Sequence, residues 1–203
     1  MNLLDVAENS VAAGAKLVRI ELSVDEEARR LRLAIIDDGK GMDPELAKRV
    51  TDPFCTSRTS RKVGLGLPFL KMAAELTGGQ LTLESEEGKG TAVTALFCTD
   101  HIDMPPLGDV AASVAGLVQC SPDIDFVFTL VGPGGRFCAD TREMRDILGV
   151  DSLGFLSVEG VKNIAEGCGL GLCTGCFTGK YPAETPAVTE KSKFESKIPE
   201  ATE

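Results

Sequence analysis

An apolar stretch of the chain ends in two adjacent acids followed by two glycines, in the sequence AIIDDGKGMDP at residues 34–44. At the end of a strand, Asp37 could accept a hydrogen bond from the exocyclic amino group of a purine. Gly39 and Gly41 have no Cβ atom, so a base and the backbone could approach closely there. Acids at a strand end can also simply mark a turn, so this stretch alone leaves both interpretations open.

A carboxylate and an amide stand four residues apart near the N-terminus, in the sequence DVAENS. Apolar residues recur around them at helical spacing, so Asp5 and Asn9 are predicted to share one face of a helix. Oxygen atoms from such a pair could hold a hydrated Mg²⁺ ion. The alternative is a polar helix face in contact with solvent.

Two further glycine motifs occur later in the chain. GLGL at residues 64–67 opens a predicted helix, whose free N–H groups and dipole favour phosphate. Arg58, Arg61 and Lys62 lie just upstream and could add charge-assisted hydrogen bonds. GKGT at residues 88–91 is a tight turn between two predicted strands, and alone it predicts only a hairpin.

The elements that position these motifs follow from hydrophobic periodicity and from start and stop residues. Helices are predicted over residues 3–13, 43–50, 67–77, 104–119, 140–149 and 157–167, and strands over 16–24, 30–37, 80–97 and 125–140, the last two ranges each folding back as a hairpin. Asp43 and Asp140 are expected as N-caps, Pro44 as a first helical residue, and the prolines at 105–106 as the start of the fourth helix.

In this order the four motifs resemble the GHKL superfamily of gyrase, the large heat-shock chaperone, histidine kinases and MutL, over residues 1–98. The resemblance implies a two-layer α/β sandwich of the Bergerat type, with helices on one face of a mixed sheet, that binds ATP and Mg²⁺. Asn9 would hold Mg²⁺, Asp37 would recognise adenine so that GTP is rejected, and residues 51–63 would form a lid. The nucleotide-binding residues it implies are Asn9, Asp37, Gly39, Gly41, Arg58, Lys62, Gly64, Leu65, Gly66 and Thr91.

The resemblance leaves the reaction open. In the gyrase and MutL branches a Glu stands four residues before the Mg²⁺-binding Asn, and here Asp5 would be a weaker general base because it is one methylene shorter. His101 is the one histidine, and its surroundings do not resemble a kinase phosphoacceptor, so autophosphorylation is not expected. A weak ATPase, a kinase acting on a protein partner, and an ATP-dependent switch all remain open.

The C-terminal cysteines suggest a different function. Cys168, Cys173 and Cys176 have the spacing of part of an iron–sulfur loop, so a cluster or a zinc ion is one interpretation. Residues 149–182 resemble the C-terminal end of glutamine amidophosphoribosyltransferase, whose catalytic motifs are absent here. A redox-sensing regulator, reduced thiols that pack as small apolar side chains, and a non-catalytic interaction protein are the alternatives.

Composition limits the remaining function classes. The 203 residues carry a formal net charge of −10, which disfavours nucleic acid and anionic membranes as partners. No apolar run has the length of a membrane helix, and the N-terminus lacks a basic signal region, so a cytoplasmic protein is expected. We predict an ATP-binding domain at 1–100, a helix–hairpin–helix extension at 101–149, a cysteine segment at 150–182 and a disordered tail at 183–203.

Overall fold

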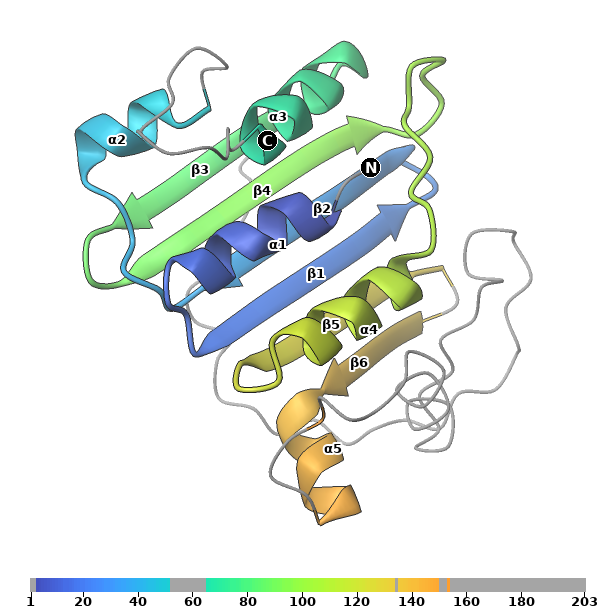
Figure 1. The fold of residues 1–203 in the computed structure, drawn as a ribbon. Coiled ribbons are helices and arrows are strands. Elements are labelled where there is room, and N and C mark those ends of the chain that lie inside the picture. Colours follow the sequence, from blue (N-terminus) through green and yellow to red (C-terminus); the bar gives the residue numbers. More distant parts are fainter. Residues whose placement is uncertain (1–2, 52–64, 134, 150–152, 154–203) are drawn as a thin grey trace.

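Six strands form one mixed sheet in the order β3-β4-β2-β1-β5-β6 (Figure 1). The computed structural model describes residues 3–51, 65–133, 135–149 and 153. The pair β1·β5 is parallel and the other neighbouring pairs are antiparallel. The strands are β1 (Leu17–Asp25), β2 (Arg30–Asp37), β3 (Gln80–Glu86), β4 (Gly90–Cys98), β5 (Asp125–Gly132) and β6 (Gly135–Asp140).

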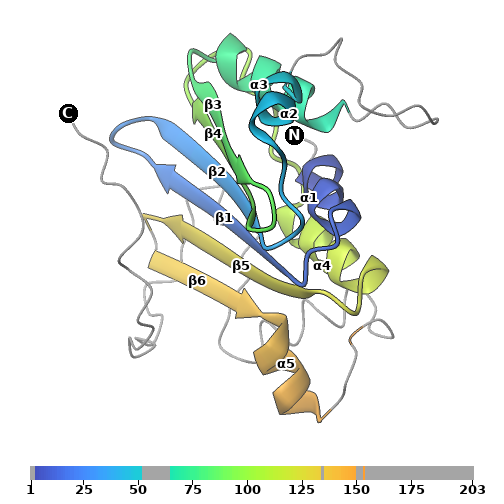
Figure 2. The same ribbon diagram turned by 90° about the vertical axis from the view of Figure 1, so that its left-hand side faces the viewer.

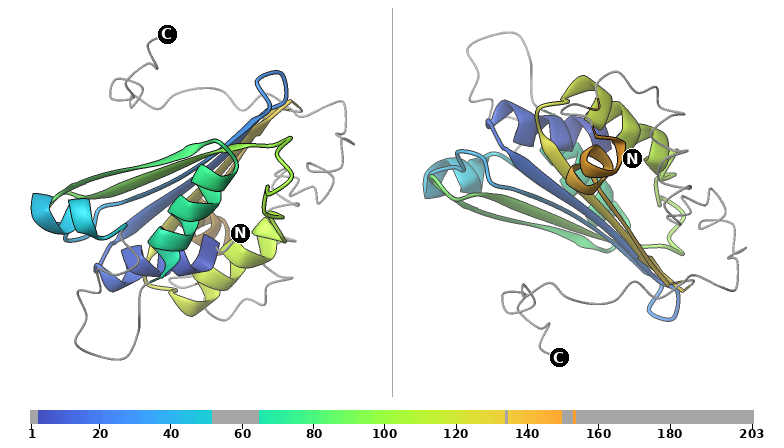
Figure 3. Two further views of the ribbon diagram at one scale, coloured as in Figure 1. Left: turned by 90° about the horizontal axis from the view of Figure 1, so that it is seen from above. Right: turned by 90° about the horizontal axis from the view of Figure 1, so that it is seen from below.

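Helices α1 (Leu3–Ala12), α3 (Gly66–Leu76) and α4 (Val110–Cys120) lie on one face of this sheet (Figures 2 and 3). Helix α2 (Pro44–Arg49) lies beside β3, and α5 (Thr141–Leu148) continues from the end of β6. Within the described ranges, no helix covers the opposite face of the sheet, which we call the open face. The predicted two-layer α/β architecture is therefore confirmed.

The core lies between the sheet and these helices. Alternate strand residues point to the same face, and those under the helices are apolar and buried. In β1 and β2 these residues are Val18, Ile20, Leu22, Leu31, Leu33 and Ile35. Helices α1 and α3 contribute Leu3, Val6, Ala7, Leu67, Leu70 and Ala74. This burial holds α1 over β2 and α3 over β3 and β4.

Side-chain caps fix the ends of several helices as predicted. The Asp43 carboxylate accepts from the N–H groups of Glu45 at 2.9 Å and Leu46 at 3.0 Å, and Pro44 is the first residue of α2. Asp140 caps α5, which ends at Gly149 with a left-handed φ of 65°. These contacts satisfy N–H and C=O groups that a helix end otherwise leaves unpaired.

The predicted start of the fourth helix was wrong. Helix α4 begins at Val110, with Asp109 accepting from the N–H of Ala112 at 2.8 Å, and the two prolines precede it in a loop. Gly108 lies between them and the helix at a φ of +72°, which a right-handed helix cannot contain. The aspartate cap, rather than proline, sets the boundary.

Residues 101–149 supply two strands to the same sheet as the GHKL-like region. The backbone N–H of Asp125 donates to the Lys16 carbonyl at 2.9 Å, where β5 starts to run parallel with β1. The predicted division of the chain into units stays a prediction, and residues 154–203, with the expected helix at 157–167 and the tail, lie outside the described residues. In the part of the chain that the structure describes, no helix is both long and apolar enough to cross a membrane.

Candidate functional site

Asp37 stands at the end of β2 with both carboxylate oxygens engaged by the protein. Its Oδ2 accepts a hydrogen bond from the Ser10 hydroxyl at 2.7 Å, and its Oδ1 accepts from the Gly39 N–H at 2.9 Å. Ser10 belongs to α1 and is only 3% exposed. The carboxylate is thus held in one orientation, half-buried on the helix-covered side of the sheet.

Ser10 is not part of any sequence motif above, although its position in the helix gives a signal for it. Leu3, Ala7 and Ser10 follow one another at helical spacing on the buried side of α1. A hydroxyl on an otherwise apolar helix face needs a hydrogen-bond partner, and Asp37 is the partner it finds.

Asp38, the next residue, serves the backbone instead. Its Oδ1 accepts from the N–H groups of Lys16 at 2.7 Å and Leu17 at 2.9 Å. Burial raises the pKa of Asp38, but the hydrogen bonds from Leu17 and Lys16 and the charge of Lys16 outweigh it, so the pKa lies below its ordinary value. The second acid therefore fastens the start of β1 to the end of β2.

Gly39 and Gly41 are packed against protein atoms. A Cβ at position 41 would lie 2.0 Å from the Glu86 carbonyl oxygen, and the φ of Gly41 is +63°. A Cβ at position 39 would lie 2.9 Å from the Cβ of Ala13. The fold itself thus requires both glycines, while close approach of a base to them remains a prediction.

The last glycine motif closes on the first. A Cβ at Gly90 would lie 1.9 Å from the Asp37 carbonyl oxygen, and Thr91 is paired with Asp37 in the β2–β4 register. The Thr91 hydroxyl lies 2.9 Å from the hydroxyl of Ser85, which also accepts from the Met42 N–H at 2.9 Å. Motifs about 50 residues apart in the chain therefore form one structure around the Asp37 backbone.

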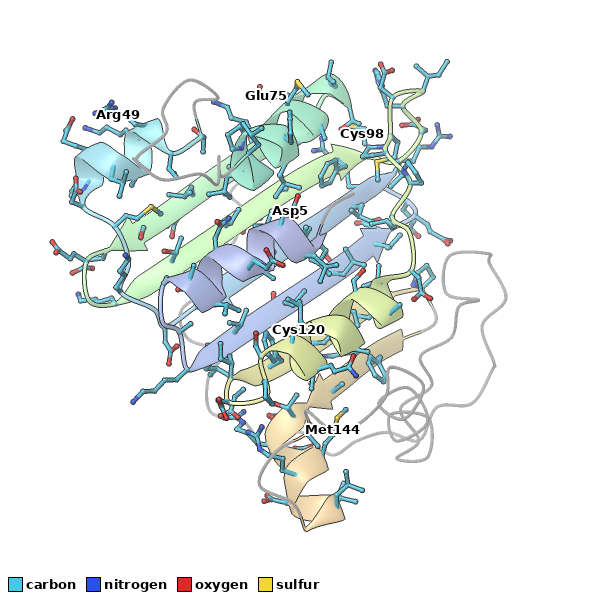
Figure 4. All side chains as sticks on the ribbon, viewed as in Figure 1. Asp5, Arg49, Glu75, Cys98, Cys120 and Met144 are labelled. Atoms are coloured by element: carbon cyan, nitrogen blue, oxygen red, sulfur yellow. The ribbon has the colours of Figure 1, made fainter. Side chains whose placement is uncertain are left out.

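The start of α3 meets the first turn of α1. A Cβ at Gly66 would lie 3.1 Å from the Cβ of Asp5, so these two backbones are in close contact. Asp5 and Asn9 are both exposed on α1, and Figure 4 shows Asp5 on the helix-covered side of the sheet. Leu65 occupies the N-cap position of α3 without a side-chain hydrogen bond, so this helix start keeps N–H groups that its N-cap side chain does not satisfy.

The predicted site residues thus divide into two sets. Those in the described ranges lie on α1, at the end of β2, at the start of α3 and at the start of β4, and the contacts above connect these elements; they are Asp5, Asn9, Asp37, Gly39, Gly41, Leu65, Gly66 and Thr91. The others lie outside the described residues; they are Arg58, Lys62, Gly64, Cys168, Cys173 and Cys176. No group of three or more His, Cys, Asp or Glu side chains in the described ranges is placed to hold a metal ion.

Comparison with known proteins identifies the family of the residues that carry this site. Residues 1–101 match the family model described as histidine kinase-, DNA gyrase B- and HSP90-like ATPase. They form an ATP-binding domain of the GHKL superfamily. The predicted GHKL resemblance is confirmed, and the GHKL domain contains α1 to α3 and β1 to β4.

The relatives are much longer proteins. A putative sensor histidine kinase, NtrY-like, from Rickettsia felis is 31% identical over 51% of this chain and 17% of its own length. The sensor histidine kinase AruS of Pseudomonas aeruginosa is 35% identical over 58% of this chain and 13% of its own. The chain therefore spans less than a fifth of either kinase. The solved catalytic domain of histidine kinase ThkA matches 47% of this chain and 62% of its own, with 22% identity and a TM-score of 0.37.

Proposed function

We propose that the GHKL domain binds ATP together with Mg²⁺ and presents it for phosphoryl transfer to a protein partner. The observation that carries this proposal is the Asp37 carboxylate, held by Ser10 and Gly39 at the strand end. An ionised carboxylate has about four lone-pair positions, so two bound donors leave capacity for the amino group of adenine. The chemistry and the position of this carboxylate fit the nucleotide that the family binds.

The other residues have complementary roles in this proposal. Asn9 would contribute its side-chain oxygen to Mg²⁺, which keeps several of its waters when few protein ligands are available. The N–H groups at the start of α3, around Leu65 and Gly66, would hold phosphate oxygens. Arg58, Lys62 and Gly64, outside the described residues, would assist there, and Thr91 would support the Asp37 end of the site. Bound ATP supplies the phosphoryl group.

An exposed apolar stripe on α3 favours transfer to a protein over hydrolysis. Phe69, Met72 and Leu76 are 54%, 51% and 55% exposed, and their spacing places them on one face of the helix. A stripe of large apolar side chains marks a protein contact surface. Since the stripe begins in the first turn of the helix whose start would hold phosphates, a partner bound there would lie close to the phosphoryl group.

Asp5 is the candidate base for the competing hydrolysis. It is exposed on α1, next to Gly66 at the start of α3. We propose that Asp5 activates water weakly, so that ATP persists until a partner binds. A cytoplasmic location fits this role but stays a prediction.

Calorimetric titration with a non-hydrolysable ATP analogue, with and without Mg²⁺, tests the nucleotide site. The wild-type chain should show saturable, Mg²⁺-dependent binding that GTP does not displace. Asp37→Asn should bind the analogue about 10- to 100-fold more weakly, because it replaces an oxygen acceptor with a donor group at a charge-assisted hydrogen bond.

Asp38→Asn is the matched control, since the neighbouring carboxylate bonds the backbone of Lys16 and Leu17. Its affinity should equal that of the wild type. Equal affinities for the wild type and Asp37→Asn would refute the assignment of Asp37. No binding by any of the three would indicate an interaction protein whose nucleotide site is not used.

A further inference from the structure

Strand β6 is an outer strand of the sheet, and nothing in the GHKL site uses it. The sheet order places β6 at one edge and β3 at the other. An outer strand presents N–H and C=O groups that can pair with another strand, so natural proteins protect such edges. Among the described elements, β3 has α2 beside it, whereas no helix or strand lies along the outer side of β6 (Figure 1).

The hydrogen bonds of β5 show which β6 residues direct their backbone outward. Asp125 donates its N–H toward β1, to the Lys16 carbonyl, and Phe126 donates its N–H toward β6, to the Thr141 hydroxyl at 2.9 Å. The backbone N–H and C=O groups of even-numbered β5 residues therefore point toward β6. The register pairs these residues with odd-numbered residues of β6, whose backbone groups point back toward β5. Arg136 and Cys138 consequently direct both backbone groups to the outside, and Asp140 directs its N–H there, while the C=O of Asp140 belongs to the first turn of α5.

These three residues are complementary to themselves. When two copies of the strand pair antiparallel about Cys138, Arg136 of one copy stands opposite Asp140 of the other, twice. The same pairing places Phe137 of one copy opposite Ala139 of the other, so a large side chain stands next to a small one. Opposite charges directly across an antiparallel pair stabilise it, whereas pairing about Arg136 or Asp140 would oppose like charges. Strand β3 lacks this complementarity because its charged residues are all acidic.

We propose that β6 is a self-association edge, through which a second copy of this chain pairs antiparallel about Cys138. The two six-stranded sheets would then form one continuous sheet with its open faces on the same side. Asp140 also caps α5 and binds the guanidinium of Arg142, with Nε 2.9 Å from Oδ1. Both of its oxygens are already engaged by Arg142, so in the paired edge Arg136 of the second copy would share this carboxylate with Arg142. At the end of the edge, α5 exposes Ile147 and Leu148, apolar area that association could cover.

Thiol cross-linking of the reduced full-length chain tests the register directly. Residues of a hydrogen-bonded antiparallel pair have Cα atoms about 5.5 Å apart, so the Cys138 thiols of two copies should be joined by a short bis-maleimide. Cys138→Ser should abolish the cross-linked dimer. Cys120→Ser removes another exposed thiol, on α4, and should leave it unchanged. A linked Cys138–Cys138 peptide supports the proposal; a dimer linked only through other cysteines, or no dimer, overturns it.

Analytical ultracentrifugation tests the charge pairs. Arg136→Glu should weaken dimerisation about tenfold or more, because it converts two attractive pairs into two repulsive ones. Arg136→Glu combined with Asp140→Asn should recover part of the loss, since Asn removes the repulsion and remains a good N-cap. Arg30→Glu, the same charge reversal on an inner strand of the open face, should have no effect. A monomeric wild type, or equal weakening by both reversals, contradicts the proposal, whereas ATP-analogue affinity should be unchanged in every variant.

Discussion

Asp37 and Asp38 are adjacent at the end of β2, yet their carboxylates belong to different structures. Asp37 bonds the Ser10 hydroxyl and belongs to the proposed nucleotide site, while Asp38 bonds the backbone at the start of β1. A local motif predicts a binding role for Asp37, whereas the hydrogen-bond partner of Asp38 lies more than 20 residues away and no local pattern indicates it. Two neighbouring acids therefore make two different predictions, one for stability and one for binding.

For Asp38 the prediction concerns stability and pH. Asp38→Ala should lower the free energy of unfolding by about 1–2 kcal/mol, because two N–H groups lose their acceptor. Asp38→Asn should retain most of this free energy, because its amide oxygen can still accept hydrogen bonds from the two N–H groups. The folded-state pKa of Asp38 is lowered, so the contribution of its charge is present above the unfolded pKa of about 3.9 and is lost as the pH falls below it. Urea titrations from about pH 6 to pH 3 should show the wild type losing its advantage over Asp38→Asn.

For Ser10 the prediction concerns binding as well as stability. Ser10→Ala removes the buried donor to Asp37 Oδ2 and should destabilise the chain by about 1 kcal/mol. It should also weaken binding of the ATP analogue roughly threefold to tenfold, because the carboxylate is no longer held in one orientation. Calorimetry and thermal unfolding of the same sample measure both effects. Ser113→Ala, which removes a hydroxyl on α4, is the control; an unchanged affinity for Ser10→Ala would show that Asp37 needs no support from α1.

At the scale of elements, the glycine turns hold α1, β2 and β4 together. Gly14 and Gly41 both have left-handed φ angles, of 72° and 63°, but a Cβ at Gly14 meets nothing within 4 Å. Gly14→Ala should therefore cost only the conformational strain, about 1–2 kcal/mol. Gly41→Ala adds a collision with the Glu86 carbonyl and should cost a further 1–3 kcal/mol or so. Chemical denaturation compares the two variants, and equal losses would mean that the turn at Glu86 moves aside freely.

The same scale shows what the sequence could predict. Local rules located α1, α2, α3 and α5, because caps, stop glycines and periodicity act within a few residues. The start predicted for α4 from two prolines was wrong, because the cap at Asp109 is the stronger local determinant. The contacts of Gly41 with Glu86 and of Gly90 with Asp37 could not be predicted, since each depends on how distant strands pair.

At the scale of the whole molecule, one long-range pairing decides where the structural unit ends. Strand β1 pairs in parallel with β5, about 100 residues later in the chain, and parallel pairing leaves no turn signal in the sequence. Family resemblance indicates the fold of the GHKL domain but not how residues 101–149 join it. Buried side chains of β5, including Phe126 and Phe128, belong to the same core cluster as those of β1. The extension and the GHKL domain therefore share one hydrophobic core.

Shared burial predicts that the GHKL domain is weakened without its extension. A chain truncated after residue 101 keeps every described candidate site residue but exposes the outer edge of β1 and the apolar side chains beside it. It should unfold at a lower temperature and at a lower urea concentration than the full-length chain, and it should aggregate more readily. A chain ending at residue 153 is the control, because it retains β5, β6, α5 and the buried Leu153.

The full-length chain should show one cooperative transition, with an m-value larger than that of the truncated chain, because more surface is exposed when both parts unfold together. Two separate transitions, with the first leaving analogue binding intact, would instead make residues 101–149 an independent unit that only rests against β1.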